Sequence, residues 1–192
     1  MSAEFAAPAL RFIAIGAAMF AFGGLTFSTL GKLKTAPPRL AAFISLAASV
    51  GAAAVWASGL LGANISPEKL SLLFGATFIG KAWLLHIIAA AIVAVYAFQR
   101  SRRLPLFALL AAASLATFAP IGHAAAADGG EKTIRILLQA THLLGAGFWV
   151  GALPLLVRQL AGEADDAARV VATFAKYASI AVFALLAAAI AN

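Results

Sequence analysis

Six long apolar runs constrain this chain more than any other feature of its sequence. About 20 apolar residues cross a bilayer as a helix, and only helices or closed barrels satisfy the backbone polar groups inside it. The runs are continuous rather than alternating, which favours helices over a barrel. We therefore predict an all-α fold, a polytopic transmembrane helical bundle that forms a single domain over residues 1–192. Its expected spans are about 9–31, 40–62, 78–98, 105–122, 133–157 and 177–192.

The composition excludes other classes of protein. Hydrophobic residues make up 64% of the chain and charged residues 11%, whereas soluble domains are about half apolar and about a quarter charged. Disordered chains have low hydrophobicity, so disorder is excluded as well. The sequence contains no cysteine, which rules out disulfides, thiolate metal sites and thiol catalysis. Because it also contains no P-loop, HExxH, GxGxxG or GxSxG motif, we expect no enzymatic activity.

The Lys and Arg residues are distributed unevenly between the two predicted sides of the membrane. The formal net charge is +7, but no basic and aromatic patch lies outside the apolar runs, so we expect no nucleic-acid partner. Basic residues are concentrated in the odd-numbered connections, which the positive-inside rule places in the cytoplasm, and the N-terminus is then outside. The odd-numbered connections contain Lys32, Lys34, Arg39, Arg100, Arg102, Arg103, Arg158, Arg169 and Lys176, and the opposite side contains Arg11, Lys69, Lys81, Lys132 and Arg135.

Local patterns predict how the helices end and pack. Residues 158–176 place acidic residues first and basic residues later, as the helix dipole prefers, and are expected to form a short interfacial helix. Gly147 and Gly151 have the GxxxG spacing that lets helices approach closely, and packing within the chain is favoured over dimerisation. Ser45 and Ser49, four residues apart, either line a polar seam or hydrogen-bond between helices.

The three histidines are the best candidates for a functional site. With the N-terminus outside, His86, His123 and His142 all fall in the outer half of the membrane, and Met19 lies at a comparable depth. Ionisable residues inside a bilayer are costly and usually face a bundle interior or a pathway. Copper accepts imidazole and thioether ligands, so these four residues form a candidate metal site. The structural alternatives are interhelical hydrogen bonding for His86, an interfacial position for His123 and core packing for Met19.

Several segments carry a resemblance to a known family. Residues 141–156 read THLLGAGFWVGALPLL, a histidine followed by small and apolar residues, then Trp, one residue and Gly. Three further segments agree in order, namely FGATFIGKAWLL at 74–85, IGHAA at 121–125 and FAKYASIAVFALLAAAIAN at 174–192. Over most of residues 74–192 the chain resembles the copper resistance D (CopD) family of bacterial inner-membrane proteins. The last segment departs from the family pattern, because it lacks the expected glycine near its end.

The resemblance implies a multi-pass protein of the bacterial inner (cytoplasmic) membrane that moves or handles copper, and the outer N-terminus would then be periplasmic. It implies His123 and His142 as copper ligands, whereas His86 lies near a position where the family often has a basic residue. Family members usually have further spans, so the bundle is either complete or a truncated part of a larger one. The expected partners are the lipid bilayer and a periplasmic copper chaperone, and the expected cofactor is a copper ion of undetermined oxidation state.

Three functions remain open from the sequence. The leading interpretation is import of copper from the periplasm, or its transfer to a partner, by exchangeable imidazole ligands. The first alternative is a transmembrane haem b electron carrier in which His86 and His142 ligate the iron. The second is a metal-free membrane assembly partner whose histidines hydrogen-bond between helices.

Overall fold

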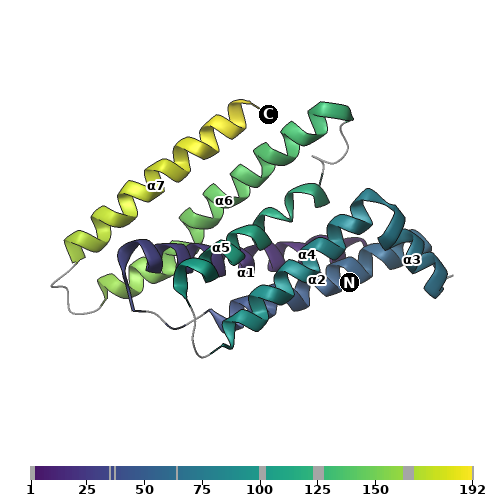
Figure 1. The fold of residues 1–192 in the computed structure, drawn as a ribbon, viewed down its shortest axis with the longest axis horizontal. Coiled ribbons are helices and arrows are strands. Elements are labelled where there is room, and N and C mark those ends of the chain that lie inside the picture. The colour runs from purple at the N-terminus through teal and green to yellow at the C-terminus, as the bar shows by residue number, and fades with distance from the viewer. Residues whose placement is uncertain are drawn as a thin grey trace.

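The computed structural model describes residues 3–34, 36, 38–63, 65–99, 103–122, 128–161 and 167–191, and within these ranges every regular element is helical. The elements are α1 (Ala3–Gly31), α2 (Arg39–Leu61), α3 (Pro67–Ala76), α4 (Phe78–Ala97), α5 (Leu104–Ala116), the short η1 (Ala119–Ile121), α6 (Gly129–Leu160) and α7 (Ala167–Ile190) (Figure 1). Six stretches in the described ranges are long and apolar enough to cross a membrane, namely Phe5–Gly31, Arg39–Leu61, Phe78–Ala97, Leu104–Ile121, Gly129–Leu160 and Ala167–Ile190. The predicted all-α polytopic bundle is therefore confirmed.

The sequence interpretation missed α3, which lies between the second and third spans. Its start is encoded by Ser66, whose Oγ accepts a hydrogen bond from the Lys69 backbone N–H at 3.3 Å, and by a proline in the first turn. Thr77 then separates α3 from α4 and caps α4, since its Oγ1 accepts a hydrogen bond from the Gly80 N–H at 2.9 Å. A Cβ at Gly80 would overlap the Leu73 backbone, so this glycine permits the sharp turn between the two helices.

The connection between α6 and α7 differs from the prediction. Helix α6 continues to Leu160 and α7 begins at Ala167, so the prediction of a separate interfacial helix over residues 158–176 was wrong. The reason is that the apolar face of the last span extends further toward the N-terminus than its hydropathy indicated, and Val170 is already buried. The Nη1 of Arg169 donates a hydrogen bond to the Gly31 carbonyl oxygen at 3.1 Å, which joins the start of α7 to the end of α1. Residues 162–166 lie outside the described ranges.

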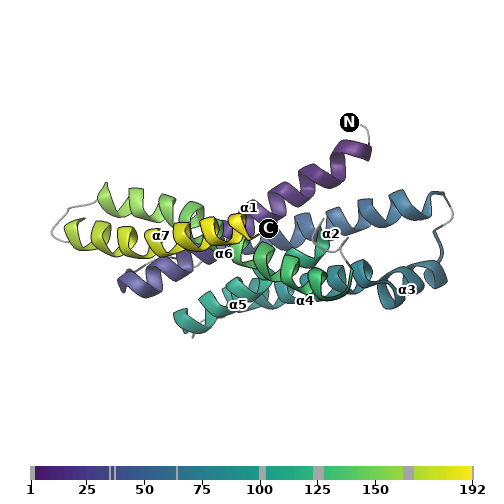
Figure 2. The same cartoon turned by 90° about the horizontal axis from the view of Figure 1, so that it is seen from above.

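Helix α1 lies at the centre of the bundle. It packs against α2, α5 and α6, whereas α7 packs mainly on α6 at the edge of the molecule (Figures 1 and 2). On the other side of α1, α4 packs against both α2 and α5. The four helices α1, α2, α4 and α5 therefore enclose a common interior, and α6 and α7 form an adjoining pair.

Glycines allow α1 and α6 to approach each other closely. A Cβ at Gly151 would overlap the Met19 backbone, and a Cβ at Gly23 would overlap the Gly147 backbone. Small residues at helix interfaces permit this kind of backbone contact in membranes. The GxxxG pair Gly147 and Gly151 therefore serves packing within the chain, as predicted.

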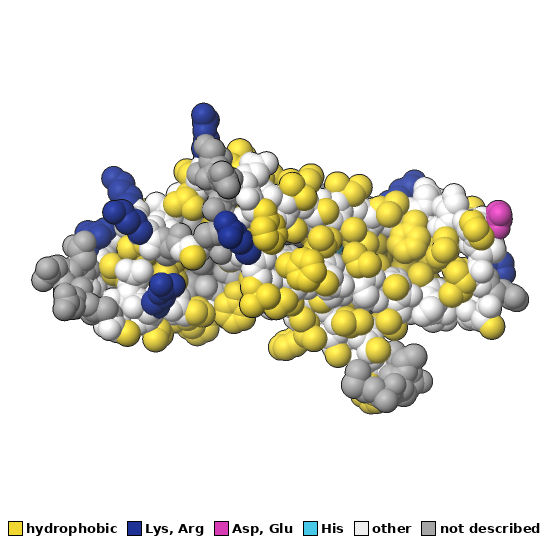
Figure 3. Space-filling model, turned by 90° about the horizontal axis from the view of Figure 1, so that it is seen from below, with side chains coloured by type: hydrophobic (Ala, Val, Ile, Leu, Met, Phe, Trp, Pro, Cys, Tyr) yellow, Lys and Arg dark blue, Asp and Glu magenta, His cyan; other side chains and the backbone are white. Residues whose placement is uncertain are grey.

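The molecular surface has a broad apolar region and charged ends. Large side chains such as Phe12, Val95 and Ile190 are exposed, which fits a surface in contact with lipid. Figure 3 shows Lys and Arg side chains gathered toward one end of the face in view and an acidic side chain at the other. The first end carries Lys32, Lys34, Arg39, Arg103, Arg158 and Arg169 without a carboxylate among its described residues, and the second carries Lys69, Lys81, Lys132, Arg135, Glu68, Asp128 and Glu131.

We expect Gly151→Ala to destabilise the protein, because its Cβ would overlap the Met19 backbone and α1 would have to shift. Overpacking of this kind costs about 1–3 kcal/mol in the free energy of unfolding. Gly16→Ala is the matched control, since nothing lies within 4 Å of its Cβ position and alanine is the better helix former by about 1 kcal/mol. Thermal unfolding in detergent measures both variants, and equal melting temperatures would contradict the close α1–α6 contact.

Candidate functional site

His86 lies in the interior of the bundle, where three spans meet. Its side chain, on α4, is fully buried. The ring Nε2 lies 2.8 Å from the Oγ of Ser49 on α2, and the ring Nδ1 lies 2.8 Å from the Oγ1 of Thr117, which follows α5. The Phe118 ring packs on the imidazole with a centroid separation of 3.8 Å, and the Trp83 ring stands at 72° to the imidazole with a centroid separation of 6.2 Å. His86 therefore ties α4 to both α2 and α5.

The two hydroxyls around His86 continue into a wider set of hydrogen bonds. Ser49 donates to the Ser45 carbonyl oxygen at 2.6 Å, and Thr117 donates to the Ser114 carbonyl oxygen at 2.6 Å. The Ser45 hydroxyl in turn donates to the Ala14 carbonyl oxygen of α1 at 3.0 Å. This polar cluster connects α1, α2, α4 and α5 through side chains that are buried or half-buried.

The number of protons in this cluster limits its chemistry. Each hydroxyl has one proton and a neutral imidazole has one N–H, whereas the two His86 contacts and the two hydroxyl-to-carbonyl bonds require four protons. With a neutral ring, one hydroxyl must therefore turn from its carbonyl and donate to the imidazole. A doubly protonated ring would satisfy all the contacts but would place a charge in the bilayer, which is costly. The neutral ring leaves one accepting nitrogen, and a metal ion would bind there.

Two cavities lie on opposite sides of His86 along the bundle axis. The larger, which we call the Arg11 cavity, has a volume of about 450 Å³, and the smaller, the Ser114 cavity, has about 10 Å³, close to the minimum that holds one water molecule. The Arg11 cavity is lined by Ala7, Pro8, Arg11, Phe12, Ile15, Ala52, Trp56, Ile79, Trp83 and Ile121. The Ser114 cavity is lined by Ala18, Ala21, Ala42, Ser45, Ala90, Val93, Ala111 and Ser114.

The helical register places His86 between these cavities. On α4, Trp83 lines the first cavity one turn before His86, and Ala90 lines the second one turn after it. On α2, Ala52 and Ser45 flank Ser49 in the same way. His86 is therefore one helical turn from a residue that lines each cavity, although the imidazole itself is in neither lining.

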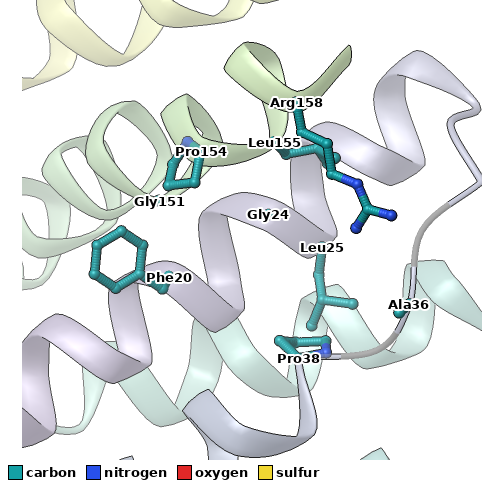
Figure 4. A pocket seen from close by; sticks show the side chains of 9 residues that line it. All are labelled: Phe20, Gly24, Leu25, Ala36, Pro38, Gly151, Pro154, Leu155 and Arg158. Carbon is teal, nitrogen blue, oxygen red and sulfur yellow. The ribbon is translucent and has the colours of Figure 1, made fainter. Parts of the chain in front are cut away.

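Another cavity, of about 230 Å³, lies at the basic end of the molecule, and α1 and α6 contribute to it. Figure 4 shows Phe20 on one side of this space and the guanidinium of Arg158 on the other, with Pro154 of α6 above it. Its lining contains no histidine. It is therefore separate from the His86 cluster.

Of the four residues proposed from the sequence, the structure describes three, and it places them in different surroundings. His142 is exposed on α6, on the same face as Gln139 and Trp149, which are exposed too. Met19 is half-buried, and its Cγ lies 3.4 Å from the Cβ position of Gly147, so it packs against α6. His123 lies outside the described residues.

Consequently, no metal centre of several side chains is assembled in the part of the chain that the structure describes. There, no group of three or more His, Cys, Asp and Glu side chains is placed to hold an ion. The contacts of His86 come from α2, α4 and the end of α5, not from α6. The physical reason is that α6 buries the face containing Gly145 and Phe148 against its neighbours and leaves His142 outside.

Sequence reasoning missed two features of this site. Ser114 and Thr117 stand three residues apart in an otherwise apolar run, which is the signal that could have placed Thr117 beside a buried polar group. Arg11 was counted only for its charge, although a cation inside the first apolar run indicates a functional position.

We expect Ser49→Ala to destabilise the protein by about 1–3 kcal/mol, because it leaves the buried Nε2 of His86 without its partner. Ser58→Ala is the control, since the Ser58 hydroxyl donates to a carbonyl on the exposed surface of the same helix and surface substitutions usually cost less than about 0.5 kcal/mol. Chemical unfolding in detergent gives both values. A loss for Ser49→Ala no larger than that for Ser58→Ala would exclude the hydrogen bond to His86.

The family described as Copper resistance protein D-like, N-terminal domain matches residues 1–133. The matched region contains α1 to α5 with His86, Ser49 and Thr117, and it ends before His142. No curated protein and no solved structure matches the chain. The segments at 74–85 and 121–125 lie inside the matched residues, whereas those at 141–156 and 174–192 lie outside them. Because the match covers more than half of the residues, the predicted family is confirmed, and the chain belongs to the Copper resistance protein D-like family.

Proposed function

We propose that this chain handles copper in the bacterial inner membrane by accepting the ion at His86 and moving it inward or passing it to a partner. Membership of a copper resistance family supports a role in copper resistance or transport. The observation that carries the assignment to His86 is its position, because it is a fully buried imidazole between a large cavity and a small one that is lined mainly by alanine.

The chemistry of the cluster suits a transient ligand. Imidazole is a good ligand for copper, whereas hydroxyls suit harder cations. Copper at the accepting nitrogen of His86 would displace the hydroxyl that donates there, and this hydroxyl would donate instead to the carbonyl oxygen one turn earlier, Ser45 for Ser49 or Ser114 for Thr117. One strong ligand among weak ones binds the ion and also releases it, as permeation requires. Since no nucleotide-binding motif is present in the sequence, a gradient or downstream binding would drive the movement.

The distribution of charge supports a periplasmic N-terminus. The basic end of the described structure is formed by the connections after α1 and α4 and by the facing ends of α6 and α7, and the positive-inside rule favours this end for the cytoplasm. The Arg11 cavity is lined by the first turns of α1, so it would lie toward the periplasm. Copper would then meet His86 from that side.

His123 remains a candidate for the first contact with copper. It directly follows Gly122 in the sequence, and a Cβ at Gly122 would lie 3.0 Å from the Arg11 guanidinium. A periplasmic copper chaperone would deliver the ion to this end of the bundle. Met19 and His142 lie at the α1–α6 contact and on the exposed face of α6, so a ligand role for either would belong to a site separate from His86.

A metal-free role in membrane assembly is the second candidate. It is favoured by the complete hydrogen bonding of His86, since both of its ring nitrogens have partners within the chain. No observation favours the haem b alternative, because His86 is buried while His142 is exposed on a different helix. The copper and metal-free candidates differ in one measurable property, which is whether copper uptake depends on the His86 ring.

We expect His86→Gln to abolish copper uptake into proteoliposomes that contain the purified chain. Glutamine can donate to one of the hydroxyls and accept from the other, so it retains a polar partner for Ser49 or Thr117 but removes the imidazole ligand. His142→Gln is the matched variant, since it removes an imidazole from an exposed position, and we expect it to transport copper as the unmodified chain does. Mass spectrometry of the copper inside the vesicles gives the rate.

Three outcomes would contradict the assignment. Uptake that is lost in His142→Gln and retained in His86→Gln would move the site to the surface of α6. Uptake by the unmodified chain that is retained in both variants would exclude His86 as the ligand, and the absence of uptake from all three proteins would favour the metal-free role.

The orientation has a direct test, because the chain contains no native cysteine. We expect Gly130→Cys, at the exposed start of α6, to react in intact spheroplasts with a maleimide that does not cross membranes. Lys34→Cys, in the connection after α1, should react only after the membrane is opened. Labelling of Lys34→Cys in intact spheroplasts, with Gly130→Cys protected, would reverse the orientation and place the Arg11 cavity on the cytoplasmic side.

A further inference from the structure

Arg11 is a cation inside a membrane-spanning helix. It lies six residues after Phe5, where the first span begins, which is about 9 Å along the helix. Its side chain is half-buried. Within the described residues the only ion pair joins Arg135 to Glu131, so Arg11 has no carboxylate partner there. A cation at this depth is stabilised by an anion, and the described part of the chain does not provide one.

A second hydrogen-bond donor without a partner lines the same cavity. The indole of Trp83 is only 3% exposed, and its Nε1–H has no hydrogen-bond acceptor among the described residues. Buried donors in native proteins almost always have an acceptor, so an unpaired one calls for an explanation. The Arg11 cavity is thus lined by a guanidinium and by an indole whose buried N–H has no partner among the described residues, two donors that an anionic group with several oxygens can satisfy together.

The remaining walls and the opening of the cavity are apolar. Trp56, Ile15 and Ile121 line its interior side, and the lining residue Phe12 is 79% exposed on the outer surface of α1. Ile79, also in the lining, is partly exposed on α4. The cavity therefore opens at the surface that contacts lipid, and its occupant enters from the membrane with an apolar part attached to its anionic group.

We propose that the Arg11 cavity binds an anionic phospholipid, with the phosphate between Arg11 and Trp83 and the beginning of an acyl chain along Phe12 and Ile79. An inorganic phosphate ion would lose its hydration on entering the cavity, and it would leave the apolar walls of the cavity uncovered. A zwitterionic lipid would bring a second cation next to Arg11, which like-charge repulsion disfavours. Lipid binding at this cavity is separate from the proposed function and does not require copper. A bound phosphate would nevertheless offset the repulsion between Arg11 and a copper ion at His86.

Native mass spectrometry of the delipidated full chain in detergent tests this proposal, with phosphatidylglycerol and phosphatidylcholine as the added lipids. We expect phosphatidylglycerol to bind more tightly at one site. Arg11→Gln should weaken its binding by about tenfold or more, since a charge-assisted hydrogen bond is lost. Trp83→Phe keeps an aromatic side chain but removes the N–H together with the five-membered part of the indole, and it should weaken binding by about two- to tenfold. Lys81→Gln is the matched control, because Lys81 is exposed in the first turn of α4 and does not line the cavity.

The outcomes separate the possible occupants. Equal phosphatidylglycerol affinity in Arg11→Gln and the unmodified chain, or an equal loss in Lys81→Gln, would overturn the proposal. Displacement of the lipid by millimolar inorganic phosphate would assign the site to an aqueous anion and would overturn it as well. Melting temperatures of the variants verify folding, and if Arg11→Gln does not fold, unchanged binding in Trp83→Phe overturns the proposal and reduced binding supports it. The copper-free protein is used throughout, so failure of the copper assignment does not alter the result.

Discussion

A bilayer offers no water to polar groups, and this constraint explains how the described bundle is held together. The buried polar side chains of the described structure accordingly bond within the protein, except for the Thr26 hydroxyl and the Trp83 N–H. His86, Ser49 and Thr117 do so by bonding to one another, and their hydroxyls bond back to the carbonyl oxygens of their own helices. The result is a polar cluster that fixes the positions of α1, α2, α4 and α5, whereas α6 is held to α1 by the close contact of glycines.

The same constraint separates two kinds of polar residue in the described structure. The ring of His86 is fully hydrogen-bonded, so a ligand there has to displace a hydroxyl of moderate strength. Arg11 and the indole N–H of Trp83 line a cavity open to the lipid surface without an acceptor from the described chain. The first arrangement suits an exchangeable ligand for a cargo ion, and the second suits a group that remains bound. Trp83, which lines the Arg11 cavity, is one turn from His86 on α4. A charge bound in the cavity therefore alters the electric field at His86, and a charge at His86 alters the field in the cavity.

Hydropathy predicted the six spans because the length of an apolar run reflects the thickness of the bilayer. It missed α3, since ten residues with Glu68 and Lys69 at the start do not resemble a span, although Ser66 and Pro67 carry the usual helix-start signal. It also assigned residues 158–176 to a separate helix, because charge was given more weight than the buried apolar face around Val170. Gly147 and Gly151 were interpreted correctly, as small residues have few other uses at that spacing.

The sequence by itself determined the number of spans, the helical class, the family and the small set of residues on which chemistry could depend. Only the tertiary structure decided that His86 is buried against Ser49 and Thr117 while His142 is exposed, and that Arg11 and Trp83 share a cavity. The physical reason is that these spans are apolar on all sides, so periodicity shows which residues share a face but not which neighbour that face contacts. Helix rotation is set by packing between spans, through contacts such as Gly151 against Met19, and such contacts join residues far apart in the sequence.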